Sequence, residues 1–308
     1  MHYHITHRTV YEYSEVVTVS HHTARMKPRV TATQERGNFS LRIQPEPAVQ
    51  TMRTDYFGNR VCFFSIQQIH QRLEVTATSL VTLQRVTPPA PALSPAWSAV
   101  AGLFRNPVSP EVVEPYQFRF DSPLVCASPE LADYASECFT GEIPFLEGVQ
   151  KLNRKIHADF TYDPVATTIA TPLEQVLAQR RGVCQDFAHL AIACLRSLGL
   201  AARYVSGYLR THAPPGKPRL VGSDASHAWF SVFCPRVGWV DFDPTNNLMP
   251  SAEHITVAYG RDFSDVSPIS GILVGGGSHE IKVGVNVEET APNDPEEGTL
   301  RRSPEDTR

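Results

Sequence analysis

The amino-acid sequence predicts an α+β protein, in which an N-terminal antiparallel β-sandwich precedes a region of helices packed on an antiparallel sheet. Residues 1–90 contain several stretches of alternating apolar and polar side chains, with no helical pattern between them. From residue 128 onward, apolar residues recur at helical spacing, and after Gly199 they recur at strand spacing. Strands, then helices, then further strands are typical of an α+β fold.

Residues 1–90 are expected to form the sandwich. Residues 1–11 alternate, and residues 61–66 follow a turn at 55–60 whose Asp, Gly and Asn residues favour tight backbone bends. A long alternating run over 73–83 closes the set. Short strands at this spacing, joined without helices, are typical of antiparallel sandwiches.

Two segments differ in composition from the rest of the chain. Residues 91–120 are rich in proline, which predicts a semi-rigid linker between two domains. Residues 288–308 are acidic and contain almost nothing apolar, which predicts a disordered tail. The remaining residues, 121–287, are therefore expected to form the second domain.

Helix signals dominate the first half of this second domain. Ser128 is suited to cap a helix that begins at Pro129, and a second helical face contains Leu146, Val149, Leu152 and Ile156. The sequence 171–174, Thr-Pro-Leu-Glu, predicts a capping box and a third, short helix. After Gly199 the expected strands cover 202–209, 226–233, 238–242 and 280–287, with a hairpin connection over 211–225.

The segment 181–199 contains a cysteine at the start of a predicted amphipathic helix, which Gly199 is placed to end. Cys184 then lies in the first turn, where unpaired backbone N–H groups and the positive end of the helix dipole favour an anion. A thiolate at this position is a candidate nucleophile. Cys194, on the same helix, is expected to be an ordinary core residue.

A cysteine nucleophile needs a base and a residue that orients the base. His227 lies at the start of the predicted strand 226–233, and the next strand, 238–242, is expected to return beside it. Asp241 and Asp243 point the same way along an extended chain. Periodicity alone therefore allows either aspartate to face His227.

Four motifs combine these residues in a specific order. They are Gly-Val-Cys-Gln-Asp-Phe-Ala-His at 182–189, Ala-Arg-Tyr-Val-Ser-Gly-Tyr at 202–208, Ser-His-Ala-Trp at 226–229, and Trp-Val-Asp-Phe-Asp-Pro-Thr-Asn-Asn at 239–247. In this order they resemble the bacterial transglutaminase-like proteins, a branch of the papain-like superfamily that is often labelled with cysteine protease activity. The turn at 55–59 is similar to the β-rich N-terminal domain of this branch, and residues 259–266 match its segment after the core.

The resemblance implies a papain-like transglutaminase core over 121–287 and assigns three roles within it. Cys184 would be the nucleophile, His227 the base, and Asp243, in its Asp-Pro-Thr context, the residue that orients His227. Such a triad transfers the acyl group of an amide through an acyl-thioester. The backbone N–H of Cys184 can stabilise the oxyanion, and Tyr162 is a candidate for the second donor, or else a packed aromatic residue.

The triad does not specify what resolves the thioester. Water would make the protein a cysteine peptidase or amidase, and an amine would make it a transglutaminase that cross-links glutamine side chains. Hydrolysis is favoured because it is the commoner reaction and because of the family's protease label. A non-catalytic binding module is the second alternative. The expected partner is a protein or peptide with amide or isopeptide bonds.

The composition of the 308-residue chain excludes several other classes of function. A net charge of −4 gives no basic surface for nucleic acid, and no apolar run approaches the length of a membrane span. Six scattered cysteines without a C-x-x-C motif, and no visible secretory signal, favour free thiols in a reducing cytoplasm. No cofactor or metal is expected, because His2 and His4 have no carboxylate or cysteine near them in sequence. The oligomeric state does not follow from the sequence.

Overall fold

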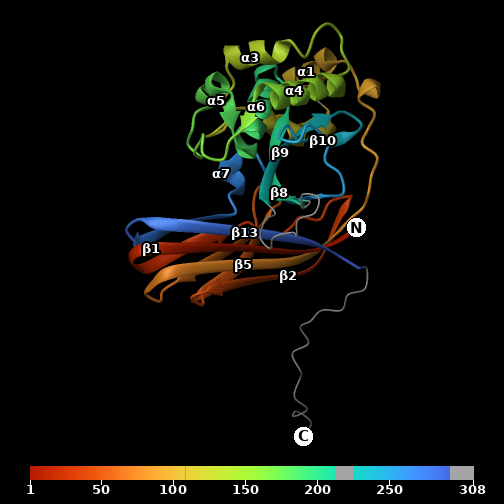
Figure 1. Ribbon diagram of the computed structural model, residues 1–308. Coiled ribbons are helices and arrows are strands. Elements are labelled where there is room, and N and C mark those ends of the chain that lie inside the picture. The colour runs from red at the N-terminus through yellow and green to blue at the C-terminus, as the bar shows by residue number, and fades with distance from the viewer. Residues whose placement is uncertain (108, 212–224, 292–308) are drawn as a thin grey trace, which may run out of the picture.

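The computed structural model describes residues 1–107, 109–211 and 225–291. Within these residues the chain forms two larger antiparallel sheets and a group of helices. Figure 1 shows the helices at one end of the molecule, the N-terminal sheet at the other, and the second sheet between them. In the described residues no helix is long and apolar enough to cross a membrane.

The N-terminal sheet is organised around one long strand, β1 (His2–Ala24), and all its pairings with β1 are antiparallel. The sheet runs in the order β2-β5-β1-β4-β3, with β12 and β13 also paired to β1. The other strands are β2 (Gln34–Gln44), β3 (Val49–Thr54), β4 (Arg60–Ile66), β5 (His70–Leu83), β12 (Ile269–Gly275) and β13 (His279–Thr290).

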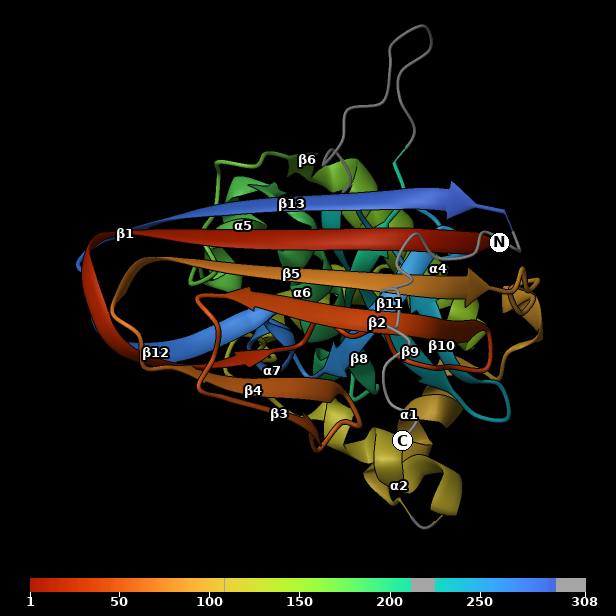
Figure 2. The same ribbon diagram turned by 90° about the horizontal axis from the view of Figure 1, so that it is seen from below.

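The sheet bends at β1, as Figure 2 shows, so that its two halves pack face to face. Residues 2–12 of β1 pair with β5 and β13, whereas residues 17–24 pair mainly with β4 and β12. One hydrophobic cluster, which includes Val17, Phe64 and Leu73, fills the space between the halves. The arrangement is therefore a sandwich formed by one folded sheet, as the sequence predicts, but several of its strands are longer than the short strands expected, with 23 residues in β1 and 14 in β5.

The C-terminal strands complete this sheet, which the sequence did not predict. The second domain was expected to include residues up to 287, but β13 pairs with residues 2–13 of β1, and β12 extends the other half of the sheet. Alternation predicts a strand but not its partner, and here the partner lies at the opposite end of the chain. Residues 288–290 of the expected tail belong to β13, and residues 292–308 lie outside the described part.

The proline-rich segment 91–120 folds into helices, so the prediction of a linker was wrong. It contains two short 3-10 turns, η1 (Pro91–Leu93) and η2 (Gln117–Arg119), and two helices, α1 (Trp97–Arg105) and α2 (Pro110–Tyr116). Val100, Phe104 and Val112 are fully buried in the main core. Proline is well tolerated at the first position of a helix, as at Pro110, so a high proline content does not by itself exclude short helices.

Four helices that follow agree with the helical patterns in the sequence: α3 (Pro129–Ser136), α4 (Phe145–Asp159), α5 (Leu173–Gln179) and α6 (Cys184–Ser197). A short helix that was not predicted, α7 (Phe263–Val266), comes later in the chain. The hydroxyl of Ser128 caps α3 as predicted, at 3.3 Å from the backbone nitrogen of Leu131. The capping box predicted for α5 is absent, since the hydroxyl of Thr171 instead accepts a hydrogen bond from the backbone N–H of Thr168.

The second sheet lies between the helices and the N-terminal sheet, in the order β10-β9-β8-β11. Its strands are β8 (Ala202–Leu209), β9 (Ala225–Cys234), β10 (Gly238–Phe242) and β11 (His254–Gly260). One core joins the layers, because Tyr3 and Val285 of the N-terminal sheet belong to the same buried cluster as Leu190 of α6 and Val232 of β9. The predicted hairpin connection lies largely outside the described residues, at 212–224.

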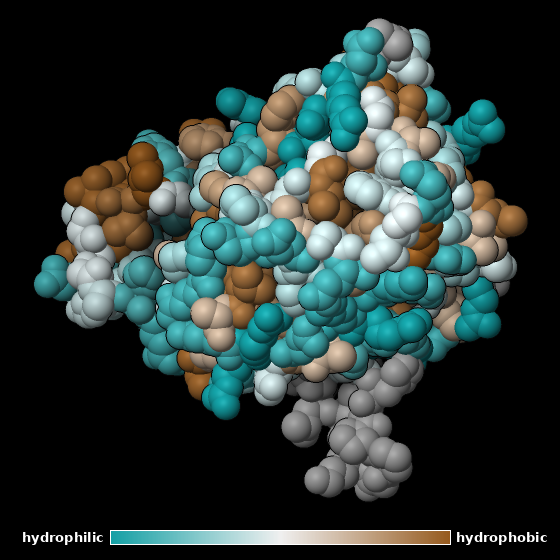
Figure 3. Space-filling view, turned by 90° about the horizontal axis from the view of Figure 1, so that it is seen from above, coloured by the Kyte–Doolittle hydropathy of each residue, from teal (hydrophilic) through white to brown (hydrophobic). Residues whose placement is uncertain are grey.

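The N-terminal sheet extends past the helices at the end where β1 bends. Figure 3, seen from the helix side, shows a hydrophobic area on this projecting end. Several apolar side chains of β12 and β13 are exposed, among them Ile272, Val274 and Val283. The helices and the second sheet therefore cover only part of the large sheet.

Candidate active site

The helix α6 begins at Cys184, and neighbouring side chains hold this turn in place. The carboxylate of Asp186 accepts hydrogen bonds from the backbone N–H of Val183 at 2.8 Å and from the hydroxyl of Thr167 at 2.6 Å. A Cβ at Gly182 would lie 2.7 Å from Asp186 Oδ2, so a side chain at this position would displace that carboxylate. The Gly-Val step before Cys184 thus has a steric reason, and Cys184 itself is half-buried.

His227 and Asp243 are brought together by the pairing of β9 with β10. His227 Nε2 lies 2.8 Å from Asp243 Oδ2, and the side chain of Asp243 is fully buried. Asp241 lies instead within 3.0 Å of Trp229 Nε1 and accepts its N–H. The hydrogen bonds therefore distinguish the two aspartates, which periodicity could not do.

The carboxylate of Asp243 accepts hydrogen bonds on both oxygens. Oδ1 accepts the backbone N–H groups of Thr245 at 2.9 Å and Asn246 at 3.2 Å. Oδ2 accepts from the side chain of Asn246 at 2.7 Å as well as from His227 and from a second histidine, His254, at 3.0 Å. Burial alone would raise the pKa of the Asp243 carboxyl, but the hydrogen bonds from His227, His254 and Asn246 hold it well below its usual range.

His227 connects this carboxylate to the cysteine. Because Nε2 faces Asp243, Nδ1 is the ring nitrogen available to Cys184, and Cys184 is close enough to raise the pKa of His227. Burial opposes a charged imidazolium, but the hydrogen bond with Asp243 and the nearby Cys184 outweigh it and raise the pKa of His227 to about 10. The local environment therefore favours the protonated form of His227 between two acidic groups.

Tyr162 lies close to Cys184 through a short parallel pair of strands, β6 (Thr161–Tyr162) and β7 (Arg181–Gly182). Tyr162 pairs with Gly182, which precedes Cys184 by two residues. Its side chain is about half exposed. Burial raises the pKa of Tyr162, and the negative charge of the Cys184 thiolate raises it further. The phenol is thus near enough to the cysteine to respond to its charge.

His254 and Asn246 were not recognised as site residues in the sequence. His254 begins β11, a strand that was not predicted, and Asn246 was only part of the motif at 239–247. Among the described residues, one group of three possible metal-binding side chains lies close together: His227, Asp243 and His254. One nitrogen or oxygen atom of each lies within 4.8 Å of those of the other two. Two N–H···O hydrogen bonds to one carboxylate account for this approach. A histidine at an i+11 spacing from the Asp-Pro-Thr aspartate is the only local signal for it.

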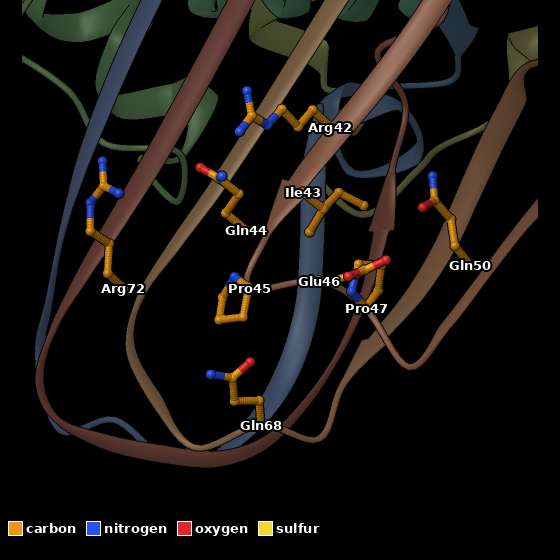
Figure 4. A pocket seen from close by; sticks show the side chains of 9 residues that line it. All are labelled: Arg42, Ile43, Gln44, Pro45, Glu46, Pro47, Gln50, Gln68 and Arg72. Carbon is orange, nitrogen blue, oxygen red and sulfur yellow. The ribbon is translucent and has the colours of Figure 1, made fainter. Parts of the chain in front are cut away.

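One surface pocket lies away from the triad candidates. It has a volume of about 690 Å³ at the turn between β2 and β3, and Figure 4 shows its lining residues, which include Arg42, Glu46 and Arg72. None of the triad candidates lines it. Neither His2 nor His4 lines this pocket, and His2 Nδ1 lies 2.9 Å from the hydroxyl of Thr82.

Two family models match the chain in the order expected from its architecture. Residues 3–82 match the bacterial transglutaminase-like N-terminal region, and residues 132–244 match the transglutaminase-like superfamily. The second match contains Cys184, His227 and Asp243.

Known proteins resemble the chain over different lengths. An uncharacterized protein of Mycobacterium tuberculosis is 42% identical over 287 residues, covering 88% of this chain and 87% of that protein. A solved structure of a candidate cysteine protease from Cytophaga hutchinsonii has a TM-score of 0.71 at 22% identity, and the match covers 94% of this chain and 92% of the other. A protein-glutamine gamma-glutamyltransferase of Pseudomonas aeruginosa is 31% identical over 99 residues, which are 30% of this chain and 15% of that protein. The chain therefore belongs to the transglutaminase-like superfamily and has the bacterial transglutaminase-like N-terminal region ahead of its core.

Proposed function

We propose that this protein is a cysteine-dependent enzyme that transfers the acyl group of an amide bond, with Cys184 as nucleophile, His227 as base and Asp243 as the residue that orients His227. The observation that carries the proposal is the buried hydrogen bond between Asp243 Oδ2 and His227 Nε2, next to a half-buried Cys184 at the start of α6 that raises the pKa of His227. Three groups in this order are what a thiol nucleophile requires. The membership of the superfamily supports the same assignment.

The reaction begins with a proton transfer from Cys184 to His227, which leaves a thiolate beside an imidazolium. The raised pKa of His227 favours this charged pair, and Asp243 stabilises the imidazolium. The thiolate attacks the amide carbonyl carbon, and His227 donates its proton to the departing nitrogen. An acyl-thioester on Cys184 and a free amine, or ammonia, result.

The negative oxygen that forms during the attack needs hydrogen-bond donors. We assign the backbone N–H of Cys184 as one donor, because the first N–H groups of a helix have no partner within the helix. Tyr162 is our candidate for the second, since its phenol lies close enough to sense the charge of Cys184. The exposure of about half its side chain agrees with a residue that faces a substrate rather than the core.

Hydrolysis is the favoured fate of the thioester. His227 would remove a proton from water, and the hydroxide would attack the thioester carbonyl. The C–S bond would then break, which restores the Cys184 thiolate and releases the carboxylic acid product. The Cytophaga hutchinsonii relative described as a candidate protease supports this reading. Transfer to an amine is the second candidate, supported by the gamma-glutamyltransferase that matches part of the core. The substrate class we propose is a protein or peptide with an amide or isopeptide bond. We further propose that the protein works in a reducing compartment, in keeping with its six free cysteines.

The two reactions are separated by incubation with a glutamine-containing peptide, with and without a primary amine, followed by mass spectrometry. Conversion of glutamine to glutamate, or a cleaved chain, indicates hydrolysis, and an amine adduct indicates transfer. Activity should be lost in Cys184→Ala and kept in Cys126→Ala, because Cys126 is an exposed cysteine outside the site. A Cys184→Ala variant with wild-type activity would refute the proposal.

A further inference from the structure

His254 is a second histidine on the carboxylate of Asp243, and it has to be a hydrogen-bond donor. Its Nε2 lies 3.0 Å from Asp243 Oδ2, and its side chain is buried. The pKa of Asp243 is held low, so this carboxylate is ionised and can only accept. The proton between them therefore sits on Nε2 of His254. Within the described residues Nδ1 of His254 is buried without a hydrogen-bond partner, so Asp243 is the hydrogen-bond partner of this ring.

The ring of His254 is held in one orientation. It packs edge-on against Trp229, with ring centroids 5.2 Å apart and an interplanar angle of 88°. The other end of Trp229 is fixed by its hydrogen bond to Asp241. The ring centroids of His227 and His254 lie 5.9 Å apart, and both rings place Nε2 against the same oxygen, Oδ2 of Asp243.

The strand that carries His254 is attached to the N-terminal sheet by two side-chain amides. Gln34 donates to the carbonyl of Thr256 at 2.7 Å and accepts the N–H of Thr256 at 2.8 Å. Asn59 forms the same kind of pair with Tyr259, at 2.8 Å and 2.9 Å. Each amide takes the place of a neighbouring strand at the outer edge of β11. On its other edge β11 pairs with β8, where His254 lies opposite Leu209.

We propose that His254 is a positioning residue for the triad: it fixes the Asp243 carboxylate so that Oδ2 faces His227, and the N-terminal sheet holds β11 in register for this contact. The inference rests on the proposed function of Cys184, His227 and Asp243. Without the His254 donor, Oδ2 would keep only His227 and Asn246 as partners. The carboxylate would then be less well fixed and less stabilised as an anion, and it would support a protonated His227 less strongly.

Two substitutions separate the donor from the packing. His254→Gln keeps an N–H donor of similar reach to Nε2, whereas His254→Phe keeps a ring against Trp229 but removes the donor. The readout is the rate at which iodoacetamide alkylates Cys184 across a pH series, followed by peptide mapping, with Cys126 of the same molecule as internal control. We expect His254→Phe to slow Cys184 by about 10- to 100-fold at neutral pH, as for loss of a hydrogen bond to a charged group. His254→Gln should stay within about threefold of wild type, and Cys126 should not change.

The outcomes distinguish this inference from the proposed function. A folded His254→Phe variant whose Cys184 reacts at the wild-type rate would overturn the role of His254 and leave the triad intact. Equal losses in the Gln and Phe variants would also overturn it, because a donor in the same place would then have no value. If wild-type Cys184 reacts no faster than Cys126, the triad itself fails.

The tautomer of His254 in the wild-type protein gives a test that needs no variant. Nitrogen-15 NMR of the imidazole rings should show His254 protonated at Nε2 around neutral pH. A proton on Nδ1 alone would contradict the inference, since Nε2 could then not donate to Asp243.

Discussion

Trp229 donates its indole N–H to Asp241 across the β9–β10 pair, at 3.0 Å. Asp241 is the other aspartate that could have faced His227, and this hydrogen bond holds it against Trp229 instead. The two aspartates are separated by one residue and lie on the same side of the chain. Their hydrogen-bond partners differ completely, since Asp243 binds His227 and His254. Asp241 is therefore a matched control for Asp243.

Replacing each aspartate by asparagine should separate their contributions. In Asp243→Asn the amide no longer stabilises a charged His227, and loss of the orienting carboxylate in a triad lowers the rate by up to about 10⁴-fold. Asp241→Asn keeps an oxygen that can accept from Trp229, so we expect less than about a threefold change. Steady-state turnover of an amide substrate by both variants checks this. Equal losses in the two would refute the assignment of Asp243.

The pKa of His227 should depend on Cys184. Burial lowers this pKa, but Asp243 and Cys184 both raise it, and together they bring it to about 10. In Cys184→Ala the contribution of the cysteine disappears, so the pKa of His227 must fall below that of the wild type. NMR titration of the imidazole protons in both proteins measures the difference. An unchanged midpoint, or one that rises, would show that the two side chains do not interact.

The part of the site that the sequence predicts is the part encoded by neighbouring residues. The bounds of α6 follow from signals at its ends: Cys184 begins it, and Gly199, with φ of 77°, lies in the left-handed conformation that ends a helix. Ser128 caps α3 for the same reason, since the capping hydroxyl and the backbone N–H that donates to it, that of Leu131, are three residues apart.

The contacts that the sequence does not predict join distant parts of the chain. β13 pairs with β1 although the paired residues lie about 280 positions apart in the chain, and no local sequence pattern predicts that these two strands are partners. His254 becomes part of the site only because Asp243 can accept from two rings at once. The helices of 91–120 form because Val100 and Phe104 are buried against the core, a tertiary effect that outweighs the proline content.

The attachment of β11 to the N-terminal sheet should contribute measurably to stability. Gln34→Met leaves the buried N–H of Thr256 without its acceptor, which should lower the free energy of unfolding by about 1–3 kcal/mol. Gln44→Met, at the exposed end of the same strand, should change it by less than about 0.5 kcal/mol. Urea unfolding followed by circular dichroism compares the two. Similar stabilities would argue against this attachment.

Two cysteines test the central claim most directly, because their exposure and their environment favour opposite outcomes. Cys126 is exposed, whereas Cys184 is less accessible, being half-buried, and lies beside His227. Partial desolvation of its sulfur and the negative charges of Asp121 and Glu174 raise the pKa of the Cys126 thiol, which lowers the fraction of reactive thiolate at neutral pH. Brief alkylation of the native protein with iodoacetamide at pH 7, followed by peptide mapping, measures both rates in one sample. We predict that Cys184 reacts at least about tenfold faster than Cys126. If the more exposed Cys126 reacts equally fast or faster, Cys184 is not an activated nucleophile and the proposed function is wrong.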